Sequence, residues 1–189
     1  MKEILEKIAV FADEAHGAQV RKYADERYIQ HPLRVMKTCQ DRGYSLPVLA
    51  AAILHDVLED TGKSREEIKE FLLTVMEETD TDHTLALVIE LTDVYTKDNY
   101  PRLNRRKRKA REINRLGMAS AEAQTIKYAD IIDNAIGIAG KDADFGPVFL
   151  KECEALLNKM QNGDPVLHDA AKAVIKKEME ELNSHHWHS

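Results

Sequence analysis

The sequence predicts an all-α bundle of about eight or nine helices. Apolar residues recur at three- and four-residue spacings along almost the whole chain, and no segment shows a convincing strand pattern. Of the 189 residues, 43% are hydrophobic and only 8 are Gly and 5 Pro, which excludes disordered and low-complexity classes. At this length we expect a single domain over residues 1–183, followed by a flexible tail at 184–189.

Terminal signals and periodicity mark the helices one by one. Pro32 stands at a first-turn position, and Gly43 is placed to end that helix. Ser45 caps the next helix, which is apolar nearly all round as far as Leu54 and is therefore expected to be buried. Residues 64–67 form a capping-box sequence. In chain order, the helices are predicted over residues 4–15, 31–42, 47–54, 64–75, 84–95, 101–116, 120–139, 147–160 and 164–182.

Charge and targeting signals narrow the class of protein. With 33 acidic and 27 basic residues the formal net charge is −6, which argues against a protein built to wrap nucleic acid. No window approaches the ~18–20 apolar residues of a membrane helix, and the charged amino end does not resemble a signal peptide. Two cysteines suit a reducing compartment, so we expect a cytoplasmic protein without a membrane partner.

A strongly basic run at 105–109 is most simply interpreted as a solvated helix face. A funnel for phosphate groups and an RNA contact are the functional alternatives for this run. No aromatic residue lies within it to stack on bases, which weakens the RNA alternative.

The chemically informative segment ends the most apolar helix and reads His55-Asp56-Val57-Leu58-Glu59-Asp60. Helical spacing places His55 above Glu59 and Asp56 above Asp60. Ionisable side chains in a buried element cost several kcal/mol, roughly, unless they are paired or bound to a ligand. The segment is therefore a candidate functional site rather than a solvated helix end.

Two further candidate ligands lie elsewhere, His31 at a helix start and Asp130 inside an apolar helix, with Asn134 one turn later. Taken alone, His31 could cap its helix and Asp130 could pair with Lys127. Two imidazoles with two carboxylates form a mixed nitrogen and oxygen set that suits Mn, Fe or Zn.

The order His31, His55-Asp56, Asp130 resembles the ligand pattern of the HD-domain metal-dependent phosphohydrolases. Within that superfamily the chain is similar to the RelA/SpoT-type (p)ppGpp hydrolases, including the stand-alone small alarmone hydrolases. The resemblance extends over residues 11–139. Its supporting blocks are residues 16–22, 28–32, 55–61 and 127–130, with Asn134.

The resemblance implies an HD-domain bundle, an enzyme and a set of roles. It implies that one divalent metal, most often Mn²⁺ in this family, is held by His31, His55, Asp56 and Asp130. Glu59 and Asp60 match the acidic pair that orients and deprotonates the metal-bound water. Arg21, Lys22 and Asn134 match positions that contact the nucleotide. The implied reaction removes the 3′-pyrophosphate from ppGpp or pppGpp, and we expect hydrolysis alone because no synthetase sequence follows.

Some positions depart from the family pattern and leave the substrate open. Tyr128 replaces the usual Leu, Ile131 stands where a basic residue commonly follows, and Asp133 precedes Asn134 where His or Tyr is frequent. The alternatives are ppApp, a nucleoside monophosphate or NADPH as substrate, or a non-catalytic nucleotide- or RNA-binding module. The sequence does not decide the oligomeric state, and a homo-oligomer remains one of the alternatives.

Overall fold

The structure is a computed structural model that describes residues 1–22, 24–142 and 144–185. Its ordered elements are α-helices, and an isolated bridge between Val20 and Arg27 is the only β pairing within the described residues. The predicted all-α class is confirmed, with two of the helices, α4 and α9, being single turns of four residues. In the part of the chain that the structure describes, no helix is long and apolar enough to cross a membrane.

The chain forms two compact units, residues 1–92 and residues 93–189. The single domain expected over 1–183 stays a prediction. Of the tail expected at 184–189, residues 186–189 lie outside the described residues, and the last helix continues to His185.

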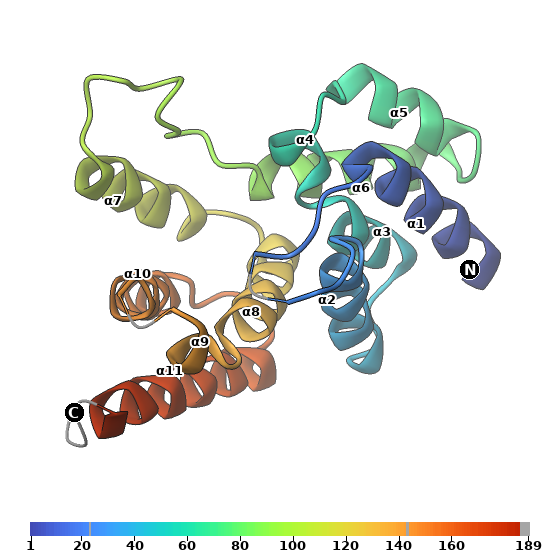
Figure 1. The fold of residues 1–189 in the computed structure, drawn as a ribbon. Helices are drawn as coiled ribbons and strands as arrows, with labels where there is room; N and C mark the ends of the chain where they lie inside the picture. The colour runs from blue at the N-terminus through green and yellow to red at the C-terminus, as the bar shows by residue number, and fades with distance from the viewer. Residues whose placement is uncertain (23, 143, 186–189) are drawn as a thin grey trace. The chain divides into compact units, whose positions relative to one another are not determined.

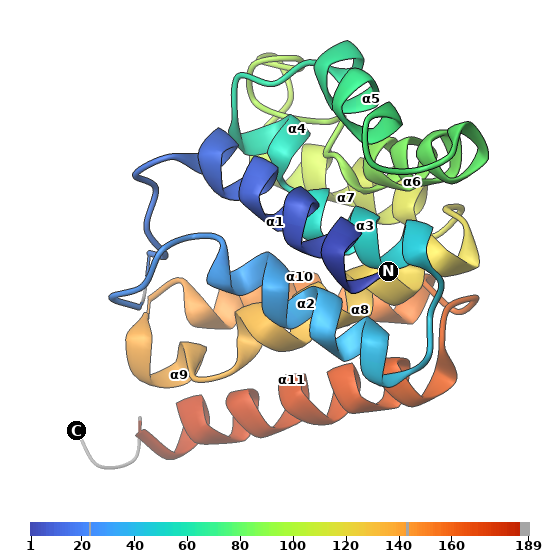
Figure 2. The same cartoon turned by 90° about the vertical axis from the view of Figure 1, so that its right-hand side faces the viewer.

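The first unit is organised around its most apolar helix, α3 (Figures 1 and 2). Residues 47–54 of α3 are all buried, as the sequence predicts, and α3 packs against α1, α2 and α6. The helices of this unit are α1 (Lys2–His16), α2 (Gln30–Asp41), α3 (Leu46–Leu54), α4 (Val57–Asp60), α5 (Arg65–Leu73) and α6 (Glu78–Leu91). A buried central helix with neighbours on several sides gives the residues that follow it a rigid support.

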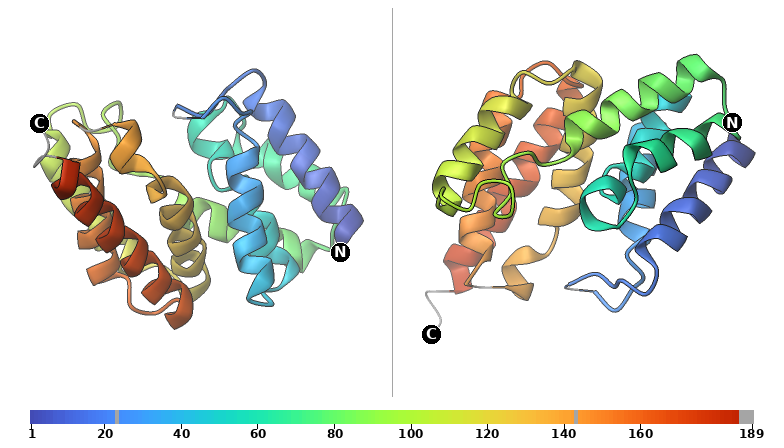
Figure 3. Two further views of the ribbon diagram at one scale, coloured as in Figure 1. Left: turned by 60° about the horizontal axis from the view of Figure 1, so that its bottom comes forward. Right: turned by 90° about the horizontal axis from the view of Figure 1, so that it is seen from above.

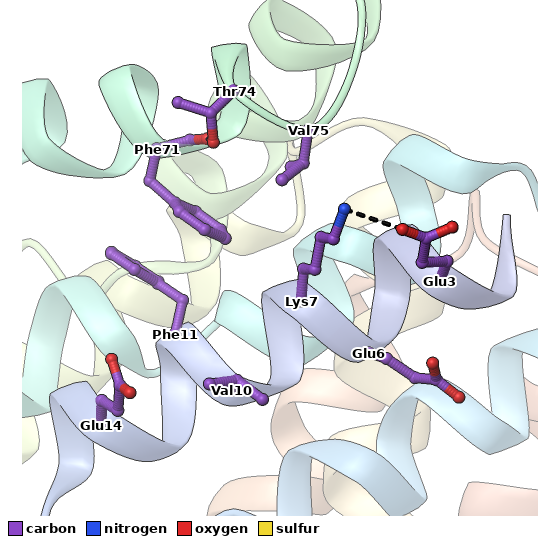
Figure 4. Close-up of a pocket in the computed structure, with 9 residues that line it drawn as sticks. All are labelled: Glu3, Glu6, Lys7, Val10, Phe11, Glu14, Phe71, Thr74 and Val75. Atoms are coloured by element: carbon purple, nitrogen blue, oxygen red, sulfur yellow. Dashed lines mark hydrogen bonds and ion pairs between the residues drawn. The ribbon is translucent and has the colours of Figure 1, made fainter.

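Helices α1 and α5 meet through a pair of stacked rings (Figure 4). The Phe11 and Phe71 rings lie 4.1 Å apart, centroid to centroid, with planes 7° apart. Val10 and Val75 line the same shallow groove, whose rim carries the ion pair of Lys7 and Glu3. The stack fixes the carboxyl-terminal half of α1, the helix that ends at the site described below.

The second unit contains α7 (Arg105–Leu116), α8 (Ala121–Ala135), α9 (Ile138–Lys141), α10 (Gly146–Lys159) and α11 (Pro165–His185). Helix α8 packs along α11, and α10 packs against both α7 and α11 (Figure 3). Nine residues of α8 are buried, so this helix is the core element of the unit.

Several predicted helix boundaries were wrong, for identifiable reasons. The helix expected at 84–95 is α6, which begins at Glu78 because its acidic first turn is favourable at a helix N-terminus. The helix expected at 101–116 begins only at Arg105, where the Asn104 side chain accepts a hydrogen bond from Lys107 N–H. The helix expected at 120–139 ends at Ala135, and Gly137 then adopts the left-handed conformation with φ 75°.

The connection between α10 and α11 is locked onto α8. The Tyr128 hydroxyl donates to the Met160 carbonyl at 2.8 Å, and the Asp164 N–H donates to the Thr125 hydroxyl at 2.9 Å. Between these bonds, Gly163 lies so close to α8 that a Cβ there would be 2.5 Å from Tyr128 Cε2. The same Cβ would be 2.9 Å from the Thr125 backbone nitrogen, so a side chain could enter only if the backbone moved.

We therefore expect Gly163→Ala to lower the free energy of unfolding by about 1–3 kcal/mol, the usual cost of overpacking a core. Gly140→Ala is the matched control, because nothing lies within 4 Å of its added Cβ, and its effect should stay within about 0.5 kcal/mol. Urea unfolding monitored by circular dichroism measures both. Equal stabilities of the two variants would contradict the close approach of Gly163 to α8.

Candidate metal centre

Three side chains of the first unit form a group that could hold a metal ion. His31 lies in the first turn of α2, and His55 and Asp56 lie between α3 and α4. One ligand atom from each lies within 4.8 Å of the other two. The histidine residues are 1% and 3% exposed, so both imidazoles are withdrawn from water. These are three of the four ligands that the sequence predicts.

The end of α3 positions His55 and Asp56. The apolar helix ends at Leu54, as predicted, and the segment from His55 to Asp60 that follows it contains a separate single turn, α4, beginning at Val57. Both intervening residues keep right-handed helical dihedral angles, and Asp60 N–H still donates to the Asp56 carbonyl at 2.8 Å. The predicted four-residue relation of Asp56 to Asp60 therefore holds across the break.

Hydrogen bonding orients His55 toward the carboxylate. Its Nδ1 lies 2.9 Å from the Ala52 carbonyl oxygen, which can only accept, so Nδ1 carries the hydrogen. In the neutral ring Nε2 then presents a lone pair, and it lies 3.1 Å from Asp56 Oδ2. His31 Nε2 lies 3.6 Å from the same oxygen. A lone pair facing a carboxylate oxygen is stable only with a proton or a cation between them.

The donor set fits a divalent metal ion. Two imidazole nitrogens and one carboxylate oxygen suit Mn, Fe or Zn, and no thiolate takes part. A backbone carbonyl behind the ligating imidazole, as Ala52 provides for His55, is the usual support of a metal-bound histidine.

A tyrosine hydroxyl connects this group to the predicted acidic pair. Tyr28 Oη donates to Asp56 Oδ2 at 2.6 Å and lies 3.1 Å from Asp60 Oδ2. Asp60 is exposed like Glu59, but partial desolvation of its carboxyl and then the neighbouring Asp56 charge raise its pKa, and the hydrogen bond from Tyr28 opposes part of that rise. Burial and the two carboxylates raise the pKa of Tyr28 well above its usual range, so its hydroxyl keeps the proton. Glu59 is exposed on α4.

Aromatic rings extend from Tyr28 in both directions. The His16 ring lies 4.4 Å from the Tyr28 ring, Tyr28 meets His31 edge-on at 6.0 Å, and His31 meets His55 edge-on at 5.2 Å. His16 Nδ1 bonds Gln19 Oε1 at 3.0 Å, whereas its buried Nε2 has no hydrogen-bond partner within the described residues.

Sequence reasoning assigned no role to Tyr28 or His16. The signal that could have found them is their place in the blocks that carry the resemblance, three residues before His31 and at the end of the first helix.

The structure brings one member of the predicted basic pair to this group. The Arg21 guanidinium lies 5.8 Å from the centroid of the Tyr28 ring, and Lys22 is exposed beside it. The described residues of the segment from 17 to 28 form a loop, closed by Arg21 N–H to the Glu26 carbonyl at 3.1 Å and Tyr28 N–H to the Gln19 carbonyl at 3.0 Å. Positive charge is therefore held over the aromatic side of the site.

The remaining predicted residues lie on α8 in the second unit. Asp130 is buried, with Lys127 Nζ 2.7 Å from its Oδ2 and Asn134 Nδ2 2.5 Å from its Oδ1. The pairing with Lys127 is the alternative that the sequence leaves open for Asp130. The roles of Asp130 as a fourth ligand and of Asn134 as a nucleotide contact stay predictions.

Known proteins resemble the chain in segments of sequence and over most of the fold. It is 46% identical to the guanosine-3′,5′-bis(diphosphate) 3′-pyrophosphohydrolase of Aquifex aeolicus over 68 residues, which are 36% of this chain and 10% of that protein. It is 42% identical to the bifunctional (p)ppGpp synthase/hydrolase RelA of Mycobacterium tuberculosis over 59 residues, 31% of this chain and 8% of that one. The chain thus spans about a tenth of the length of these curated relatives.

Two solved structures share the fold. One is a metazoan ortholog of SpoT that hydrolyses ppGpp, with a TM-score of 0.75 and 23% identity over 92% of this chain and 94% of that one. The other is lmo0812 from Listeria monocytogenes, with a TM-score of 0.62 and 23% identity over 82% of this chain and 97% of that one. The family model of the HD domain matches residues 9–144, which include His31, His55, Asp56, Asp60 and Asp130. The chain belongs to the HD-domain family.

Proposed function

We propose that the protein is a metal-dependent hydrolase that removes the 3′-pyrophosphate from ppGpp and pppGpp, giving GDP and GTP. The observation that carries this proposal is the convergence of His31 and His55 on Asp56, with Asp60 joined to Asp56 by one hydroxyl. The similarity to a ppGpp pyrophosphohydrolase over 68 residues supports the substrate.

The metal that we propose is one Mn²⁺ ion, held by His31, His55 and Asp56 with Asp130 as the fourth ligand. When bound, a divalent ion lowers the pKa of a coordinated water so that hydroxide forms near neutral pH. The protein contributes the orientation of its ligands. His55 is fixed through Ala52, and Asp56 is fixed through Tyr28.

The acidic pair handles protons in this proposal. Asp60 lies beside Asp56, and its raised pKa suits a group that takes a proton from water and returns it to the leaving group. Glu59, exposed on the same turn, is proposed as its partner. Arg21 and Lys22 offset the negative charge of the phosphate groups, and Asn134 contacts the nucleotide.

We also place this activity in the cytoplasm. Cys39 and Cys153 are both buried and form no disulfide in the described residues, as expected of a reducing compartment.

The central test is hydrolysis of ppGpp with Mn²⁺, followed by anion exchange of the products. We expect GDP and pyrophosphate with Mn²⁺ and no products when EDTA is added. Asp56→Asn should reduce turnover by more than about 100-fold, because loss of a ligand exceeds the 10–100-fold effect of its supporting groups. Asp41→Asn, an exposed aspartate on α2, is the matched control and should keep full turnover.

Retained turnover of Asp56→Asn would exclude the metal site. Mn²⁺ binding without ppGpp turnover would support the metal site but indicate a different nucleotide substrate. The candidates to test next would be ppApp, NADPH and nucleoside monophosphates.

The acidic pair is tested separately at saturating Mn²⁺. Asp60→Asn and Glu59→Gln should each lower kcat by about 10²–10⁴-fold, the usual contribution of a positioned general acid or base. Glu66→Gln, an exposed glutamate in the first turn of α5, serves as the control. Unchanged kcat in Asp60→Asn would remove this residue from the proton-transfer step.

The fourth ligand is tested by metal titration. Asp130→Asn should weaken Mn²⁺ binding by at least about tenfold, whereas Asp133→Asn, three residues later on α8, should not. Isothermal titration calorimetry measures both dissociation constants. Equal affinities for the two variants would reduce the site to His31, His55 and Asp56.

A further inference from the structure

The Tyr28 hydroxyl contacts two carboxylates of the candidate site, those of Asp56 and Asp60. It donates to Asp56 Oδ2 at 2.6 Å and lies within hydrogen-bond distance, 3.1 Å, of Asp60 Oδ2. These carboxylates belong to different steps of the proposed function, since Asp56 holds the metal and Asp60 moves protons. Their two oxygens meet at a single proton donor.

Two carboxylates near one another repel unless a donor lies between them. A phenol hydroxyl carries one proton, which can be shared between both oxygens in a three-centre hydrogen bond, so a single hydroxyl can fix their separation. The same Asp56 oxygen faces the Nε2 atoms of His31 and His55. The direction of this oxygen therefore depends on where the Tyr28 hydroxyl lies.

The position of that hydroxyl is set by contacts that leave the ring little freedom. His16 covers one part of the ring at 4.4 Å, and the Arg21 guanidinium lies 5.8 Å from its centroid. The backbone is held on both sides, by Tyr28 N–H to the Gln19 carbonyl and by His31 N–H to the Tyr28 carbonyl, each at 3.0 Å. A side chain locked in this way can orient others without itself reacting.

We propose that Tyr28 is a positioning residue that couples the metal ligand Asp56 to the acid–base residue Asp60 through one shared hydroxyl. The coupling rests on the proposed function. It predicts that one substitution, the removal of the hydroxyl, both weakens Mn²⁺ binding and moves the Asp60 carboxylate out of position. Binding of the nucleotide should change less, because it is assigned to other residues.

The first test compares Tyr28→Phe with Tyr100→Phe, which removes the same atom from a half-buried tyrosine of the second unit. Tyr28→Phe should raise the Mn²⁺ dissociation constant about tenfold, within the range for groups that support metal ligands, and Tyr100→Phe should leave it unchanged. At saturating Mn²⁺, kcat of Tyr28→Phe should fall at least tenfold with KM changed less than about twofold.

Thermal unfolding without metal separates this role from a merely structural one. A folded Tyr28→Phe whose Mn²⁺ dissociation constant stays within twofold of the wild-type value would overturn the proposal. A fall in Tm with unchanged metal affinity would also overturn it, because it would show the hydroxyl to be only a structural contact.

A double-mutant cycle tests the coupling itself. Asp60→Asn should alter Mn²⁺ affinity in the wild-type background, and this effect should shrink at least threefold in the Tyr28→Phe background if the hydroxyl transmits it. Strictly additive effects would overturn the coupling.

The Mn²⁺ titrations in the first test and in the double-mutant cycle use the metal alone as the probe, so they remain informative when ppGpp is not the substrate. Wild-type protein that binds no Mn²⁺ would contradict the proposed function together with this inference. Equal Mn²⁺ affinities of the wild-type protein and Tyr28→Phe would contradict this inference and leave the proposed function intact.

Discussion

The first unit depends on one carboxylate oxygen, Oδ2 of Asp56, at which three separate segments meet. His31 reaches it from the first turn of α2, His55 from the end of α3, and Tyr28 from the loop between α1 and α2. Each of these polar groups is costly to withdraw from water when alone, and the costs are offset only when the groups meet one another or a cation. These contacts therefore join the start of α2, the end of α3 and Tyr28 at one point.

The apolar helix α3 supplies the buried packing that the polar site lacks, and this packing stabilises the part of the fold from which the site residues extend. Residues 47–54 are buried against α1, α2 and α6, so His55 and Asp56 leave a rigid support rather than a free loop. In the short turn α4 the Asp60 N–H donates to the Asp56 carbonyl, and this hydrogen bond keeps the two residues one turn apart. The buried packing of α3 and the placement of His55 and Asp56 therefore meet at the carboxyl end of the same helix.

Local signals predicted much of the fold, and contacts distant in sequence account for most of what was missed. Apolar periodicity located α3 and α8, and the capping box of Ser64 and Glu67 forms with both of its hydrogen bonds. The polar start of α6 carries no apolar repeat, so the predicted helix begins only at residue 84. The hydroxyl of Tyr28 meets carboxylates 28 and 32 residues away, and no spacing rule applies over that distance. The grouping of His31, His55 and Asp56 could be predicted because the resemblance fixes their order along the chain.

Asp130 shows why a buried carboxylate on an apolar helix does not by itself identify a ligand. Lys127 and Asn134, three residues before it and four after it, already contact its two oxygens, so the carboxylate is satisfied within α8. A metal ion bound at Asp130 would have to replace or share the Lys127 ammonium, since two cations at one carboxylate repel each other. The ion pair orients the Asp130 carboxylate, and the same Lys127 charge opposes the binding of a second cation there. If Asp130 is the fourth ligand, as we propose, the metal affinity depends on how readily the Lys127 ammonium leaves Asp130, a property of α8 that the ligand pattern does not contain.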